Sequence, residues 1–263
     1  MKAQTKKALE AAGYPVYGSF VKVHDDLYPM PLIQGNSKLG KDVWHSSILP
    51  TNEIIVAKDE NGNEITEKGT CPISCKGCYG TTGNYRFNDN KYSLIMRTRL
   101  LRNYPDDYFR IVSIQIENES IEKLRIHAVG DFIENEAKGF HKVLKEHPHV
   151  KAWTYTKCPI KGDIKRLGTL PNMNIVKSIV PGCGFNFGHI DYIIRVYRKL
   201  KDAGKNVYVC RCGIDKNQHC SNCSGCSDHE YVLFIEHSTG YKAEKDVLYA
   251  DIVKLIESQK GNA

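Results

Sequence analysis

The chain has 263 residues, 41% of them hydrophobic and 25% charged, which is an ordinary composition for a globular protein with a buried core. No stretch approaches the roughly 20 apolar residues that span a bilayer, and the basic N-terminus lacks the apolar run of a secretory signal, so we expect a cytoplasmic protein without a membrane partner. The formal charge of +7 permits a polyanionic partner such as nucleic acid without requiring one, because the basic residues are scattered among acidic ones.

The first 52 residues predict a layer of mostly irregular structure. Residues 1–13 predict an amphipathic helix, and the Gly-, Pro- and Tyr-rich sequence after them predicts only short strands. Residues 53–65 then predict a β-hairpin, because the dipeptide Asn61-Gly62 favours a tight turn. A loop with three cysteines, residues 69–80, follows the hairpin.

Helices and strands are expected to alternate from residue 90 to the C-terminus. Strands that recur about every 25 to 32 residues, with helices between them, are typical of βαβ units around a parallel sheet. The expected helices span residues 90–105, 134–148, 160–168, 189–204 and 245–258, and the expected strands span residues 123–129, 150–156, 173–180, 206–210 and 231–237.

We therefore expect an α/β protein built on a partial (βα)6-type TIM-like barrel, because the strands are too few for a closed eight-stranded one. The barrel would occupy residues 53–209, a cysteine-rich insertion residues 210–230, and the last strand and helix residues 231–263. Chemistry in such sheets gathers at the carboxyl ends of the strands. The sequences at those ends are GDF (130–132), TKC (156–158), PGCG (181–184) and CRCG (210–213).

Strand alternation predicts that Arg125 and His127 lie on the same face of the strand at 123–129. Such side chains inside a barrel are costly unless they are paired or face a ligand. Two interpretations stay open: a role in a pocket, or a buried ion pair on a structural face.

The ten cysteines are more typical of metal ligands than of disulfides in a cytoplasmic chain, and eight of them fall in two groups. The first group is Cys71, Cys75 and Cys78. Three thiolates on one loop can hold three irons of a 4Fe-4S cluster and leave the fourth iron open to a small molecule. Zinc stays an alternative, with His127 as a fourth ligand. The glycines that let this backbone wrap closely are Gly69, Gly77 and Gly80.

The spacing Cys-x3-Cys-x2-Cys resembles the signature of the radical S-adenosylmethionine enzymes. In those enzymes the loop follows the first strand of a partial barrel, and a Gly-Gly-Glu-like motif ends the second strand, where it contacts the amino group of bound S-adenosylmethionine. The sequence RIHAVGDF puts Gly130 and Asp131 at that point, so the resemblance gives them this role, which suits an acidic side chain. Most members have an aromatic residue before the third cysteine, where this chain has Gly77, with Tyr79 just after.

This resemblance implies an oxygen-sensitive enzyme that takes an electron from an external donor. It would reductively cleave S-adenosylmethionine to a 5′-deoxyadenosyl radical, which abstracts hydrogen from a substrate, with nucleotides or nucleic acid as one expectation. No residue is assigned to that abstraction. The expected cofactor-binding residues are Tyr79, Gly130, Asp131, Phe132, Thr156, Lys157 and Ser178.

A closer resemblance is to a phage family called gene product eighty-eight. It rests on GNSKLG, GTCPISCKGCY, RIHAVGDF, WTYTK, PNMNIVKS and the last cysteines before FIEH, and it covers roughly residues 33 to 242. This resemblance implies a viral or mobile-element origin, hence a host cytoplasm, rather than a particular reaction.

The second group of cysteines is Cys210, Cys212, Cys220, Cys223 and Cys226. The last three form a Cys-x2-Cys-x2-Cys run, and the fourth ligand must come from upstream, with Cys212 preferred over Cys210. A second 4Fe-4S cluster and a four-cysteine zinc site both stay open.

The competing interpretation of the whole chain is a non-catalytic phage protein. Its zinc or iron–sulfur sites would serve the structure, and its basic surface would contact nucleic acid or a host protein. Cys158 and Cys183 stand alone at strand ends, where a small buried side chain and a substrate or redox role are both open.

Overall fold

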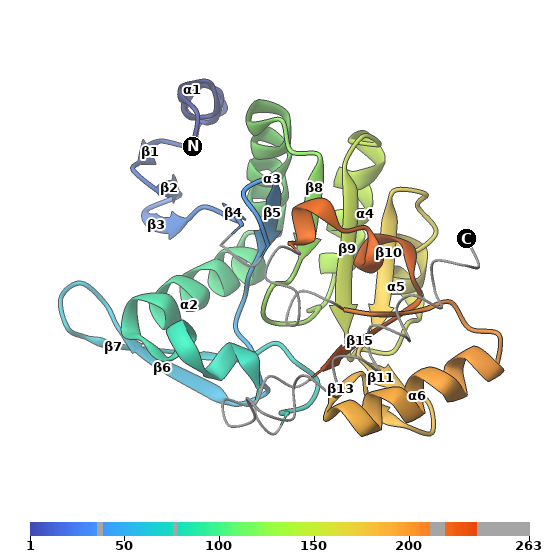
Figure 1. Cartoon of the computed structure of the whole chain (residues 1–263). Helices are drawn as coiled ribbons and strands as arrows, with labels where there is room; N and C mark the ends of the chain where they lie inside the picture. Colours follow the sequence, from blue (N-terminus) through green and yellow to red (C-terminus); the bar gives the residue numbers. More distant parts are fainter. Residues whose placement is uncertain (36–38, 76–77, 211–218, 236–263) are drawn as a thin grey trace. The chain divides into compact units, whose positions relative to one another are not determined.

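The computed structural model describes residues 1–35, 39–75, 78–210 and 219–235 (Figure 1). Within these ranges the protein is of mixed α/β type, with several sheets and seven α-helices. The chain divides into two compact units, Met1–Ile175 and Val176–Ala263. None of the helices in the described ranges is long and apolar enough to cross a bilayer.

The first unit begins with the expected helix, α1 (Ala3–Ala11), and a small antiparallel sheet of three strands. Thr5 and Leu9, four residues apart, form the buried side of α1. The strands are β1 (Val16–Tyr17), β2 (Phe20–Val23) and β3 (Asp26–Pro29).

The main sheet of the first unit has five strands in the order β10-β9-β8-β5-β4. Strands β5, β8 and β9 are parallel, and β4 pairs antiparallel with β5 at the edge. Strands β5, β8, β9 and β10 therefore lie side by side in the order in which they occur along the chain. The strands are β4 (Leu32–Gln34), β5 (Val43–Ser46), β8 (Lys123–Ile126), β9 (Lys151–Thr156) and β10 (Met173–Lys177).

The helix expected over residues 90–105 is present as α2 (Asn88–Asn103), and a second helix, α3 (Pro105–Glu119), which the sequence does not predict, follows it directly. Helix α2 ends before Pro105, and α3 begins at that proline. Proline stops a preceding helix but suits the first turn of the next one, where its missing N–H has no partner to lose. Helices α4 (Glu136–Glu146) and α5 (Gly162–Leu167) agree with the expected helices at 134–148 and 160–168.

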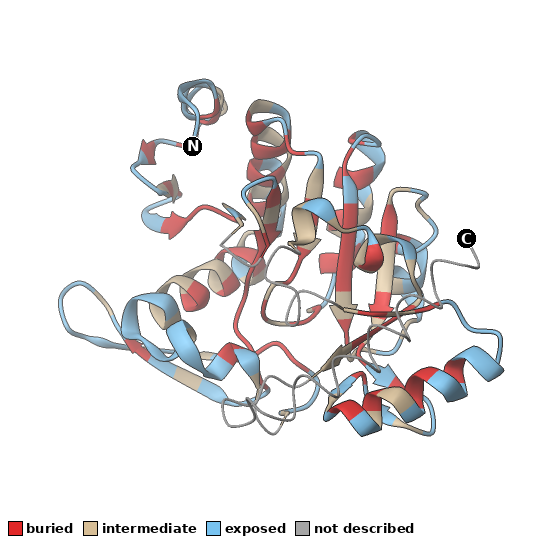
Figure 2. Cartoon of the chain, in the orientation of Figure 1, coloured by how far each residue is buried: buried red, intermediate tan, exposed pale blue. Residues whose placement is uncertain are grey.

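One face of the main sheet packs against α3 and α4. Leu124, Ile126 and Ala152 from the sheet share a buried cluster with Ile116 and Phe140 from the helices. Figure 2 shows how much of β9 is buried, which agrees with its residues being enclosed along most of the strand. Burial of this apolar surface is the main stabilising contribution to the unit.

The predicted hairpin is confirmed. Strands β6 (Ile54–Lys58) and β7 (Glu64–Lys68) pair antiparallel, and Gly62 in the turn has a φ of +82°. Asp59 accepts hydrogen bonds from the backbone N–H groups of Asn61 and Asn63, which fixes the turn. The short 3-10 helices η1 (Tyr79–Thr81) and η2 (Gly83–Arg86) connect the cysteine loop to α2.

The second unit contains a short antiparallel pair, β11 (Ile179–Val180) with β12 (Gly184–Phe185), and a parallel sheet in the order β13-β15-β14. The parallel strands are β13 (Phe187–Gly188), β14 (Val207–Val209) and β15 (Tyr231–Ile235). Helix α6 (Ile190–Asp202) packs on them through Ile193 and Val196. The remaining elements are η3 (Cys220–Asn222) and α7 (Gly225–Asp228).

The α/β class and the alternation of strands and helices are therefore confirmed up to residue 235. The sheets formed by the described strands are open, and no closed barrel is formed among them. The helix expected over residues 245–258 lies outside the described residues.

Candidate metal and cofactor site

The first cysteine group lies beyond the carboxyl end of β5. After the hairpin β6–β7 the chain returns to the segment that leaves β5, where Thr70 N–H donates to Leu49 O at 3.2 Å and Cys71 N–H donates to Thr51 O at 2.8 Å. Cys78 N–H donates to Cys75 O at 3.2 Å and closes the end of the loop. The loop is thus fixed at the edge of the sheet where parallel strands end.

Two of the glycines expected to let this loop wrap closely do so against Pro50. A Cβ atom on Gly69 would overlap Pro50 O, and one on Gly80 would lie 2.6 Å from Pro50 Cβ. A real Cβ atom could not come this close to Pro50 at either position, so only glycine allows this approach. The third glycine of that expectation, Gly77, is outside the described residues.

Asp131 connects the cysteine loop to the ends of β8 and β9. Its backbone N–H donates to Thr70 Oγ1 at 2.9 Å, and that hydroxyl in turn donates to Leu49 O at 2.7 Å. Its carboxylate accepts a hydrogen bond from Thr156 Oγ1 at 2.6 Å on Oδ1 and one from Lys157 N–H at 2.8 Å on Oδ2. Three segments that are distant in the sequence are therefore joined by one buried residue, through its backbone N–H and its carboxylate.

The carboxylate of Asp131 also accepts a hydrogen bond from Phe132 N–H, at 2.9 Å. Asp131 is fully buried, and these three bonds use both lone pairs of Oδ1 and one of Oδ2. The thiol of Cys158 adds a further hydrogen bond to this carboxylate. The contact between Asp131 and the amino group of S-adenosylmethionine stays a prediction.

The thiols of the loop lie in a common electrostatic environment with Lys157, Asp131 and Cys158. Burial raises the pKa of Cys71 to about 11, while the positive charge of Lys157 acts in the opposite direction. Burial also raises the pKa of Cys75, again against Lys157. Burial and the charge of Asp131 raise the pKa of Cys158 to about 12, with a smaller effect from Cys71. Cys158, expected to stand alone, therefore lies near the first cysteine group.

The donor set fits an iron–sulfur cluster in kind and number. Three thiols on one loop match the ligands that such clusters use, and metal binding would deprotonate thiols that burial otherwise keeps neutral. Within the described part of the chain, no three His, Cys, Asp or Glu side chains already converge on a common ion position.

The other expected cofactor-binding residues fall into different environments. Gly130 has a φ of +95°, which favours glycine, and Phe132 is buried with its ring 5.0 Å from that of His127. Tyr79 is 55% exposed, and its ring meets that of Tyr85 edge-on at 5.5 Å. Ser178 belongs to the second unit, where its carbonyl accepts a hydrogen bond from Asn186 N–H.

The expectation that His127 shares a face with Arg125 is wrong. Strand β8 ends at Ile126, and His127 adopts a φ of +58°, so the alternation of the strand stops there. Its buried side chain instead meets Glu136 of α4, with Nε2 and Oε1 2.7 Å apart. The contact occupies Nε2, whereas the buried Nδ1 makes no hydrogen bond, and it supports the interpretation of His127 as part of a buried pair.

A row of polar side chains crosses the other face of the main sheet, opposite the helices. His45 on β5 pairs in register with Arg125 on β8, and Arg125 pairs with Trp153 on β9. Side chains in register on adjacent parallel strands point to the same face. Only Arg125 of these three was expected near a pocket. The alternation in VWHS (43–46) and KAWTYT (151–156) would have shown the other two once the strands were known to be adjacent.

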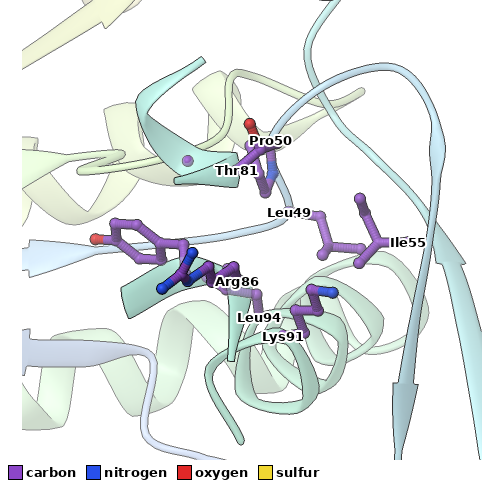
Figure 3. Close-up of a pocket in the computed structure, with 9 residues that line it drawn as sticks. Leu49, Pro50, Ile55, Thr81, Arg86, Lys91 and Leu94 are labelled. Atoms are coloured by element: carbon purple, nitrogen blue, oxygen red, sulfur yellow. The ribbon is translucent and has the colours of Figure 1, made fainter. Parts of the chain in front are cut away.

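A small pocket lies between the cysteine loop and α2 (Figure 3). Its volume is about 170 Å³, below the roughly 300–1,000 Å³ of typical ligand sites. Figure 3 shows Leu49, Ile55 and Leu94 as an apolar part of the wall, with Arg86 and Lys91 also lining it. This size suits one small group rather than a whole nucleoside.

The second cysteine group lies in the second unit. Cys223 Sγ lies 3.4 Å from the N–H of Gly225, which donates to it, and 3.5 Å from the hydroxyl of Tyr208. Cys220 begins η3 and Cys226 lies in α7, so the Cys-x2-Cys-x2-Cys run extends over two short helical turns. Cys210 follows β14, its N–H donating to Leu233 O, and Cys212 is outside the described residues. None of the nine described cysteines is joined in a disulfide.

Comparison with known proteins gives one match. A family model described as Gene product 88 matches residues 30–181, which is more than half of the chain. The match includes the first cysteine group and the segment around Asp131, and it ends before the second cysteine group. A search of the curated proteins and a search of the solved structures each find no match.

Proposed function

The chain belongs to the gene product 88 family, and we propose that it is an iron–sulfur enzyme of radical S-adenosylmethionine type. Cys71, Cys75 and Cys78 would hold the cluster. When bound, the cluster would supply an open iron for S-adenosylmethionine and the electron for its reductive cleavage. Cofactor chemistry of this kind leaves positioning and shielding to the protein.

The observation that carries the proposal is the hydrogen-bonded connection between the cysteine loop and the two following strand ends. Asp131 after β8 is joined to Thr70 of the loop through its backbone N–H and to Lys157 after β9 through its carboxylate. A loop that only needed to bind a structural metal would have no requirement for GDF beside it. The order of β5, β8, β9 and β10, each beside its predecessor, supports the partial barrel that the proposal assumes.

The chain's own residues would bind and orient the reactants. Lys157 would favour the deprotonated form of Cys71 and Cys75 through its positive charge. Asp131 would position Thr70 and the backbone of Lys157, and its carboxylate would accept an ammonium proton of the methionine group in place of the Cys158 thiol. Substrate would approach from the polar face of the sheet, because α3 and α4 cover the other.

A second candidate is a non-catalytic protein whose cysteine groups bind zinc or iron for structure, with nucleic acid or a host protein as partner. The hydrogen bond from Gly225 N–H to Cys223 Sγ favours it for the second unit, because donors of this kind stabilise a metal-bound thiolate. The formal charge of +7 is compatible with a nucleic-acid partner.

Anaerobic purification tests the proposal. We expect about four irons and four sulfides per chain for one cluster, or about twice that for two. Incubation with S-adenosylmethionine and a reductant should form 5′-deoxyadenosine. Bound zinc without this product would favour the second candidate and rule out the first.

Matched cysteine variants assign the site. Cys71→Ser should abolish 5′-deoxyadenosine formation, whereas Cys183→Ser, in the second unit and outside both cysteine groups, should leave it near the wild-type rate. Undiminished product from Cys71→Ser would show that the first loop does not hold the reactive cluster.

A further inference from the structure

The polar row on the main sheet contains two buried N–H groups that have no partner. Arg125 Nε and Trp153 Nε1 are both inaccessible to solvent and make no hydrogen bond. These residues face one another across β8 and β9, in register. Buried donors without a partner are rare, because each has given up its hydrogen bond to water and gained nothing in exchange. Two of them side by side indicate a place that a ligand completes.

The surroundings of this pair are positively charged or neutral. The guanidinium of Arg125 lies over the ring of Tyr155, 5.1 Å from its centre, and one of its other nitrogens donates to Ala128 O at 3.3 Å. Both contacts hold the planar group in place and leave Nε unused. Arg97 of α2 adds a second guanidinium, whose Nε donates to Met30 O at 2.8 Å.

His45 completes the row as a neutral side chain. Burial, followed by the positive charges of Arg125 and Arg97, lowers the pKa of His45 to about 4. Its Nδ1 lies 3.0 Å from Ser47 Oγ. Nδ1 also lies 3.4 Å from Ser46 O, a carbonyl that only accepts, so Nδ1 carries the proton and donates, and Nε2 is a bare acceptor. Arg125 and Trp153 have donors only and accept nothing.

We infer that Arg125 and Trp153 form a binding site for an oxyanion, a phosphate or a carboxylate, on the ligand that this face of the sheet receives. An oxyanion offers several acceptor lone pairs to convergent N–H donors, and a fixed guanidinium is the group that recognises it best. A neutral polar ligand would leave the two positive charges of Arg125 and Arg97 without compensation.

The position of the row makes the ligand a substrate, a step that rests on the proposed function. Tyr155 follows Trp153 at the next position of β9 on the same face, and Lys157 comes directly after the strand ends. Lys157 acts electrostatically on Cys71 and Cys75, so the cysteine loop lies near the end of β9 toward which this row leads. The substrate would therefore reach from the cysteine loop to an anionic group at this row.

The indole of Trp153 provides a direct test. The chain has two tryptophans, and the other, Trp44, lies on the helix-covered face of the sheet, in register with Leu124. In protein labelled with 15N-tryptophan, the two indole N–H signals are assigned with Trp44→Phe. We expect the Trp153 signal to move saturably on titration with inorganic phosphate, with acetate, or with both, while the Trp44 signal stays in place.

Sodium chloride at the same ionic strength is the control, and it should leave the Trp153 signal unmoved. A shift with phosphate alone identifies a phosphorylated ligand, and a shift with acetate alone identifies a carboxylate. A Trp153 signal that neither anion moves, or that chloride moves equally, overturns the inference.

Arg125→Lys tests the guanidinium, because lysine keeps the charge but lacks the fixed N–H of Nε. We expect it to weaken anion binding at least tenfold, and equal binding would overturn the role of Arg125. The titration needs neither cluster nor S-adenosylmethionine. Formation of 5′-deoxyadenosine without a Trp153 shift would therefore remove only this inference, and a shift without that product would remove only the proposed reaction.

Discussion

His45 shows at the residue scale how a charged neighbourhood fixes a protonation state. It is 7% exposed and stands beside Arg125 in the sheet, and its pKa is lowered from the ordinary 6.5 to about 4. Between these two values the unfolded chain binds a proton that the folded chain does not. Stability from this residue is therefore complete above about pH 6.5 and is lost as the pH falls toward 4.

We predict that this loss amounts to about 3 kcal/mol of unfolding free energy between pH 6.5 and pH 4. His45→Asn removes the titrating group, so its stability should fall less over the same range, and the difference between the two proteins isolates His45. Urea unfolding at several pH values measures it. Parallel curves for the two proteins would contradict the prediction.

Asp131 is the second residue whose environment allows a sharp prediction. Asp131→Asn keeps the size but turns one oxygen into an NH2 group, which would then face a donor from Phe132, Thr156 or Lys157. We expect a loss of about 3 kcal/mol in unfolding free energy, measured by chemical denaturation, because a buried acceptor is replaced by a second donor.

The hydroxyl of Thr156 separates this effect from simple packing. Thr156→Val removes the donor to Asp131 while preserving the shape, and we expect it to cost about 2 kcal/mol. Thr156→Ser keeps the hydroxyl and should cost about 1 kcal/mol for the lost methyl group. A serine variant less stable than the valine variant would show that the methyl contact, not the hydrogen bond, dominates.

At the scale of elements, the close approach of the GDF turn to the cysteine loop depends on Gly130. A Cβ atom there would lie 2.5 Å from Ile48 Cγ1 and 3.1 Å from Thr70 Oγ1, at a φ of +95°. Gly13 has a similar φ of +91° but nothing within 4 Å of the added atom. The two positions therefore separate backbone strain from steric overlap.

We predict that Gly130→Ala costs about 3 kcal/mol of unfolding free energy, from strain and overlap together, and that Gly13→Ala costs about 1 kcal/mol from strain alone. Gly130→Ala should also lower the metal content of the purified protein, because the overlap displaces Thr70 at the start of the cysteine loop. Equal losses of unfolding free energy in the two variants would mean that the cysteine loop moves away from the added Cβ atom without a free-energy penalty.

The sequence predicts most helices and strands of this protein, but not which of them lie side by side. The hairpin at 53–65, the strands at 150–156 and 206–210 and the helix at 189–204 follow from turn residues and hydrophobic spacing. Helix α3 does not, because Pro105 ends one helix and begins another, and only the first effect was expected. The face of His127 was misjudged because alternation assumes an extended residue, and a φ of +58° interrupts it.

The candidate site was predictable only in part, for the same reason. The spacing of Cys71, Cys75 and Cys78 predicts a cluster loop, whereas the role of Asp131 in joining three segments depends on tertiary contacts. The partnership of His45 with Arg125 and Trp153 requires the strand order and register. Neither is encoded in local spacing, since the paired residues lie 80 positions apart (His45 and Arg125) and 28 positions apart (Arg125 and Trp153) in the chain.

At the scale of the whole molecule, the two cysteine groups belong to different compact units. The first lies in Met1–Ile175, and the described members of the second lie in Val176–Ala263. The family match, residues 30–181, contains the first group and not the second. The segment that carries the first group thus lies within the family match, whereas the second group lies beyond it.

This division predicts that the two sites fill independently. Cys71→Ser should remove the metal of the first site alone, Cys223→Ser that of the second alone, and the double variant should lose the sum, because changes in separate units add when they share no partner. Metal and sulfide analysis of the four proteins measures this directly. If Cys223→Ser also emptied the first site, the second site would be required for the assembly of the first, and the two units would have to be treated as one cofactor-binding body.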